Sequence, residues 1–130
     1  MSAGKYSFTI EQGATLQFEI QYKDSTNSPI DLSTYNGRMQ VRPTVGSSEV
    51  YLNLSSTLQS DGTGLNFSGS NGNTPPSSGS IGIYISAATS SNLNFNEAYY
   101  DLEIYSGSGV NEYVVRLLEG KVKLSKEVTR

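Results

Sequence analysis

The amino-acid sequence predicts an all-β protein, a β-sandwich of about eight short antiparallel strands in which residues 1–130 form one domain. Segments in which apolar and polar residues alternate recur along the chain, separated by turns rich in glycine, serine and asparagine. Ser, Thr, Asn and Gly make up about two fifths of the sequence, whereas alanine, the strongest helix former, occurs only five times. The links are short and no long helix is predicted.

The first half of the chain contains four predicted strands. Residues 6–10 form a short one, and residues 15–22 alternate cleanly, so that Phe18 points into the core. Residues 36–42 and 49–54 repeat this pattern with Met, Val and Leu on the inward face. The small polar residues at 1–5 predict a flexible N-terminal segment.

The second half of the chain begins with turn and loop signals. The Asp-Gly-Thr-Gly sequence at 61–64 is a candidate hairpin turn, and residues 68–80, which lack periodicity and contain two successive prolines, predict an exposed loop. Residues 81–85 form the next strand with three isoleucines on one face. Ser86 is a candidate N-cap for a single helical turn within residues 86–93.

The C-terminal third predicts a β-hairpin with one apolar face, turning at the Ser-Gly-Ser-Gly sequence of residues 106–109. Leu102 lies on the inward face of its first strand, and Leu118 on that of its second. Keeping Leu118 inward would also turn Arg116 inward. Either Arg116 is buried with a carboxylate partner, or a β-bulge near Arg116 and Leu117 resets the register, and the bulge is the favoured alternative.

Histidine and cysteine are both missing from the sequence. The chain therefore lacks the usual general base, the commonest metal ligand, and thiolates for catalysis or disulfides, so we expect a non-enzyme with no catalytic, cofactor-binding or metal-binding residues. The net charge of −3 argues against nucleic acid and anionic lipid as partners. No apolar run approaches membrane-spanning length, and the N-terminus lacks the apolar core of a signal peptide, which predicts synthesis in a cytoplasm.

Two other patterns have competing interpretations. Asp101 and Glu103 share one strand face, where a carboxylate pair could cleave glycosides, but cross-strand pairing with Lys121 and Lys123 is favoured. The glycine clusters lack the strand, Lys and helix of a phosphate loop and the carboxylates of a calcium site, so they are interpreted as turns.

Tyrosine is the residue class with the clearest functional signal. Several tyrosines point away from the predicted core, where they either anchor a protein partner or simply suit half-exposed strand positions. They could also stack sugars. The predicted partner-binding residues are Lys5, Tyr6, Tyr51, Tyr84, Tyr99 and Tyr105.

Five segments resemble a known family. Residues 29–42 look like the P-I-D-L-T-G-Y-x-x-R-M-Q-V-R segment of small virion structural proteins of tailed bacteriophages. Residues 10–15 resemble their I-x-Q-G-A-T start. Residues 100–104, 116–120 and 127–130 are similar to their Y-D-L-E … R-L-L-E-G-x-V-x-x-S-P-E-V-T-R finish. Only the middle of the chain, from about residue 55 to residue 80, looks like an insertion that the family does not share.

This resemblance implies an immunoglobulin-like β-sandwich, similar to the N-terminal domains of phage baseplate upper proteins. It implies a structural component of a virion that assembles in many copies with other virion proteins, in the tail or baseplate, or alternatively as a capsid decoration or neck protein. A carbohydrate-binding module for host glycans is the competitor from another class. Lys126 replaces a frequent proline of the family, and the residues after Tyr35 vary, but the family implies no chemistry that these departures would affect.

Overall fold

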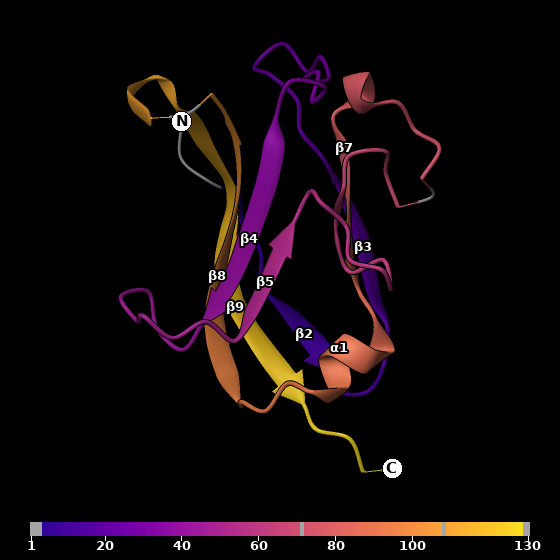
Figure 1. Cartoon of the computed structure of the whole chain (residues 1–130), viewed down its shortest axis with the longest axis vertical. Helices are drawn as coiled ribbons and strands as arrows, with labels where there is room; N and C mark the ends of the chain where they lie inside the picture. Colours follow the sequence, from indigo (N-terminus) through magenta and orange to yellow (C-terminus); the bar gives the residue numbers. More distant parts are fainter. Residues whose placement is uncertain (1–3, 71, 108, 129–130) are drawn as a thin grey trace.

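The computed structural model describes residues 4–70, 72–107 and 109–128, and in this part of the chain nine strands form two sheets that pack against each other (Figure 1). The larger sheet has the order β1-β9-β8-β4-β5, with β2 also paired to β9, and the smaller sheet has the order β3-β7-β6. The predicted all-β fold is therefore confirmed, and its two packed sheets are those of a β-sandwich.

The elements follow one another closely along the chain. They are β1 (Gly4–Lys5), β2 (Phe8–Glu11), β3 (Leu16–Gln21), β4 (Asn36–Arg42), β5 (Leu52–Ser55), β6 (Gly64–Asn66), η1 (Pro76–Ser78), β7 (Ser80–Ile85), α1 (Ala87–Ser91), β8 (Glu97–Ser106), η2 (Gly109–Asn111) and β9 (Tyr113–Ser125). The helix α1 is capped as predicted, because the Ser86 side chain accepts a hydrogen bond from the Thr89 N–H.

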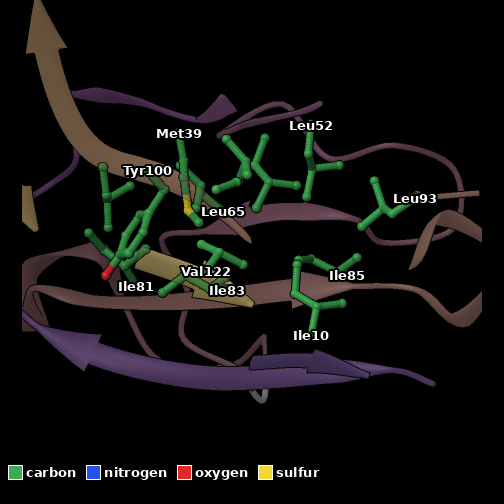
Figure 2. Packing of buried hydrophobic residues seen from close by; sticks show 14 of the residues in the cluster. Ile10, Met39, Leu52, Leu65, Ile81, Ile83, Ile85, Leu93, Tyr100 and Val122 are labelled. Carbon is green, nitrogen blue, oxygen red and sulfur yellow. The ribbon is translucent and has the colours of Figure 1, made fainter. Parts of the chain in front are cut away.

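Both sheets contribute to one apolar core, seen from close by in Figure 2. The larger sheet supplies Met39 and Leu102, and the smaller sheet supplies Ile81 and Ile83, all fully buried or nearly so. Burying each such side chain stabilises the fold by about 1.5–3 kcal/mol. Phe18 also packs against this core but is only half-buried, because its strand β3 lies at the edge of the smaller sheet.

The N-terminal segment, predicted to be flexible, is described in part. Gly4 and Lys5 form β1, which pairs with Leu118 and Glu119 of β9, while residues 1–3 lie outside the described residues. The pairing of β1 and β2 with β9 is parallel, so the larger sheet is mixed, and the prediction of a purely antiparallel sandwich was wrong at this edge. Short N-terminal strands can join an edge in this way because they extend an existing ladder of backbone groups.

Two features of the larger sheet hold the N-terminal segment in place. The Tyr100 hydroxyl donates a 2.6 Å hydrogen bond to the Tyr6 carbonyl oxygen. Gly120 leaves room for that carbonyl, since a Cβ atom at this position would overlap it. The close approach of the two backbones therefore depends on a glycine inside a strand.

The bulge predicted near Arg116 and Leu117 is present. Leu102 pairs with Leu118 but Glu103 pairs with Arg116, so Leu117 is the extra residue in β9. The register shift lets Leu118 contact the core while Arg116 stays on the outer face of the sheet.

The turn at residues 61–64 does not close a hairpin, because β5 belongs to the larger sheet and β6 to the smaller one. It lies on the connection that crosses between the sheets. Asp61 fastens this connection to α1 by accepting hydrogen bonds from the Ser86 hydroxyl, at 2.6 Å, and from the Thr89 hydroxyl, at 3.2 Å. The hydrogen bond from Ser86, followed by the N–H of Thr63, lowers the pKa of Asp61 to about 2.

Residues 68–80 were expected to be an exposed loop, and they are exposed only in part. Gly69 and Gly79 are buried, and Ser80 already belongs to β7. Ser70 packs onto Gly82 of β7, where a Cβ atom would lie 2.7 Å from the Ser70 Cα atom. This segment therefore lies against the outer face of the smaller sheet, a placement that its polar, aperiodic sequence did not reveal.

Candidate interaction surface on the larger sheet

The outer face of the larger sheet carries an array of charged side chains connected by ion pairs. Strand alternation places it there: every second residue of β4, β8 and β9 points away from the core. The pairing then brings Arg38, Glu103 and Arg116 into one row across three strands. The neighbouring row contains Asp101, Glu119 and, from β1, Lys5. The array therefore combines residues from both ends of the chain.

Ion pairs connect most of these charges. The Arg38 Nε atom lies 2.5 Å from Glu103 Oε1, and the Arg116 Nε atom lies 3.5 Å from Asp101 Oδ2. Glu119 is contacted by both Arg116, at 3.4 Å, and Lys5. Positive and negative groups alternate along the row of Arg38, Glu103 and Arg116, whereas Asp101 and Glu119 lie directly opposite each other and share Arg116, which lowers their mutual repulsion.

The predicted lysine partners of Asp101 and Glu103 were wrong. The register places Lys121 opposite Tyr99, and Lys123 opposite Glu97. The bulge at Leu117 shifts β9 so that Arg116, together with Arg38 of β4, takes the role that the sequence assigned to lysines.

The electrostatics follow from these contacts. The hydrogen bond from Lys5 lowers the pKa of Glu119, and the hydrogen bond to Glu103 raises the pKa of Arg38. Asp101 differs, because burial and then the charge of Glu103 raise its pKa, with Arg116 only partly opposing them. Each carboxylate nevertheless faces a guanidinium, an arrangement that ion pairing explains without a catalytic role.

Two of the predicted tyrosines lie on this face. Tyr99 lies beside Lys121, whose Nζ atom is 5.8 Å from the ring centre, and Tyr105 stacks against Arg38, whose Cζ atom is 4.4 Å from the ring centre. Tyr105 lies six positions after Tyr99 along β8, which corresponds to roughly 20 Å. They do not form one aromatic strip.

The other predicted partner-binding residues are dispersed. Tyr84 lies on the smaller sheet, and Tyr6 lies at the side of the sandwich, where its ring packs near Phe18. Tyr51 does not point away from the core as expected, because its ring stacks on Phe95 at 4.8 Å. The structure therefore brings Lys5, Tyr99 and Tyr105 to one face and separates them from Tyr6, Tyr51 and Tyr84.

Two adjacent hollows, of about 220 and 390 Å³, lie on this face and share Val45, Tyr99 and Asp101 in their walls. Val45 comes from the connection between β4 and β5 and is 85% exposed. Sequence reasoning predicted Tyr99 but missed Val45 and the arginines around it. The alternation Arg38, Gln40 and Arg42 along one strand was the signal that could have found them.

Other site types receive no support from the described residues. In the parts of the chain that the structure describes, no three acidic side chains gather as metal ligands would. Within the same parts, none of the helices is long and apolar enough to cross a bilayer.

No protein-family model matches the chain, and no curated protein is detectably similar to it.

Proposed function

We propose that this protein is a non-enzymatic structural component of a tailed-phage virion, placed in the tail or baseplate, and that it acts by assembling with other virion proteins. The observation that carries the proposal is the outer face of the larger sheet, a charged and aromatic surface left uncovered in the monomer. A capsid decoration or neck position would use the same surface.

The segments that resemble phage virion proteins support this assignment, because they build the proposed surface. Residues 29–42 include Arg38 and Arg42 of β4, and residues 116–120 include Arg116 and the bulge. Residues 100–104 supply Asp101 and Glu103. The same segments hold the N-terminal strand, through Tyr100 and Gly120. The immunoglobulin-like character of the sandwich is part of this proposal.

The energetics of such a surface suit a repeated assembly. Exposed ion pairs contribute only about 0–1 kcal/mol each, so one isolated contact through this face would be weak. In a symmetric particle each copy makes the same contact many times, and linked weak contacts give a stable whole.

A glycan-binding role receives less support. Carbohydrate-binding sites stack sugars on aromatic rings that are gathered in one place. Here Tyr84 and Tyr99 lie on the outer faces of different sheets, and the ring of Tyr51 is stacked on the ring of Phe95. We therefore propose assembly and not glycan recognition.

Composition analysis of the particle tests the proposal. Purified virions of the phage that encodes this chain should contain the protein in many copies by mass spectrometry, and electron microscopy of intact particles should locate it in the tail or baseplate. Absence of the protein from purified virions would contradict the proposal, and location in the capsid or neck would correct the placement.

A further inference from the structure

We propose that the two adjacent hollows that meet at Tyr99 bind an acidic segment of a neighbouring virion protein, with Arg42 of one hollow and Lys121 of the other contacting its carboxylates. This inference rests on the assembly role proposed above and specifies the chemistry of one partner. It depends on three observations: the position of the two cations, the lack of a carboxylate within 4.0 Å of either among the described residues, and the shape of the surface between them.

The strand register places the two cations on either side of Tyr99. Arg42 of β4 pairs with Tyr99 of β8, and Tyr99 pairs in turn with Lys121 of β9. Neighbouring strands are about 4.8 Å apart, so the backbones of Arg42 and Lys121 are separated by roughly 10 Å. The tyrosine ring lies between them and is itself close to the Lys121 ammonium.

Among the cations that line the two hollows, these two differ in having no carboxylate within ion-pairing distance among the described residues. Arg38, Arg116 and Lys5 are each ion-paired. Neither Arg42 nor Lys121 has a carboxylate oxygen within 4.0 Å in residues 4–70, 72–107 or 109–128, although the charge of Arg42 acts at longer range on Asp101 and opposes the rise in its pKa.

Arg42 is held in position by neutral groups. Its Nη1 atom donates to the Ser47 carbonyl oxygen at 2.6 Å, and its Nε and Nη2 atoms donate to Gln40 Oε1. A guanidinium has five N–H donors, so two remain for a ligand, in a side chain already fixed in place. Preorganisation of this kind lowers the entropy lost on binding.

The residues around the two hollows favour binding of an anion, although the chain as a whole has a negative net charge. The two hollows are lined by four cationic residues and three acidic ones, whereas the whole chain has a net charge of −3. The acidic residues Asp101, Glu103 and Glu119 are already matched by Arg116, Arg38 and Lys5. Within the two hollows, the positive charge without an ion pair is therefore at Arg42 and Lys121, and charge complementarity selects a carboxylate-bearing partner.

A protein segment fits this geometry. In an extended chain, alternate side chains point to the same side about 7 Å apart, so two acidic residues at that spacing can reach both cations across the Tyr99 ring. Val45 projects beside the ring and offers an apolar contact to the intervening backbone.

Binding of synthetic hexaglutamate to the full-length protein, followed residue by residue by NMR, tests the inference. We expect shift changes concentrated at Arg42, Tyr99 and Lys121, which weaken as salt is added. The R42Q/K121Q variant should bind about tenfold more weakly, the effect of losing two charge-assisted contacts. Because Arg42 also fastens the Val45 connection, the single variant K121Q, which touches no such contact, should show a smaller loss in the same direction.

The matched control is K23Q/K123Q, which removes the same charge at cations that line neither of the two hollows and should leave binding unchanged. Equal losses in both double variants, or shifts spread over all cations, would overturn the inference. A concentration-dependent dimer that dissociates in R42Q/K121Q would overturn it in favour of a second copy, and stronger binding of sialyllactose than of hexaglutamate would overturn it in favour of an acidic glycan.

Different results would contradict this inference and the proposed function. Absence of the protein from virions contradicts the assembly role, whatever hexaglutamate does. If the protein is present in virions but hexaglutamate does not bind at the two hollows, only the inference of an acidic partner is contradicted.

Discussion

The two sheets have outer faces of similar polarity that are used in opposite ways. On the larger sheet, the polar side chains of β4, β8 and β9 pair with one another and leave the face open. On the smaller sheet, polar side chains of β3 hold the chain's own connection between β6 and β7. Glu19 Oε1 accepts a 2.8 Å hydrogen bond from the Ser70 N–H, and the Gln21 amide donates to the Ser78 carbonyl oxygen at 2.8 Å.

The difference between the two outer faces originates in the size of the side chains at their centre. Gly82 in the middle of β7 allows the Ser70 backbone to pack directly on the smaller sheet. The larger sheet has Arg38 and Arg116 at outer positions, and these long side chains are ion-paired with carboxylates of the neighbouring strands. A polar outer face therefore does not by itself indicate a surface free for partners, because the chain can satisfy its own polar groups there.

The largest expected effect comes from the core that supports both faces. Leu102→Ala should lower the free energy of unfolding by about 2–5 kcal/mol, because it opens a cavity between the sheets. Chemical denaturation measures the loss. An unchanged unfolding midpoint would show that the inward face of β8 is assigned wrongly, and with it both outer faces.

The covered face of the smaller sheet should be sensitive to a single side chain. Gly82→Val should lower the free energy of unfolding by about 1–3 kcal/mol, since the new side chain must displace Ser70. Hydrogen exchange should increase in residues 68–78. Gly46→Ala is the control, because a Cβ atom there meets nothing within 4 Å. Equal effects of the two substitutions would contradict the close packing on this face.

The open face depends on an N-terminal strand that Tyr100 secures. Tyr100→Phe should cost about 0.5–1.5 kcal/mol at neutral pH through the lost hydrogen bond to Tyr6. Burial, and then the charge of Tyr6, raise the pKa of Tyr100 to about 12 in the folded protein, from an ordinary value of 10.0. The protonated hydroxyl therefore stabilises the fold fully below pH 10, and this stabilisation is lost as the pH rises towards 12.

Denaturation of the wild type and of Tyr100→Phe between pH 8 and 12 measures that loss. The wild type should lose more stability across this interval than the variant does. Parallel curves would indicate that the Tyr100 hydroxyl titrates alike in the folded and unfolded chains.

The smallest effect is expected on the open face itself. Asp101→Asn combined with Glu103→Gln should change the free energy of unfolding by only about 0–1 kcal/mol, because partly exposed ion pairs contribute little. Circular dichroism and thermal unfolding should match the wild type. Hydrolysis of a glycan or peptide by the wild type, lost in this double variant, would contradict the proposed non-enzymatic role.

Local patterns in the sequence were sufficient for much of the fold. The alternation of Met39, Leu102 and Ile83 with polar neighbours determined which face of each strand is buried. The conflict between Arg116 and Leu118 was enough to locate the bulge. Ser86 predicted the single helical turn. These features follow from periodicity and capping, which act within a few residues of the chain.

Tertiary structure alone decided which segments meet. The parallel pairing of β1 with β9 joins residues more than a hundred positions apart, and no local pattern encodes that choice. The crossing of residues 61–64 between sheets, the packing of Ser70 on Gly82, and the replacement of Lys121 by Arg116 as the partner of Asp101 have the same origin. Side-chain alternation specifies the inner and outer sides of a strand, whereas neighbours depend on how all strands share one core.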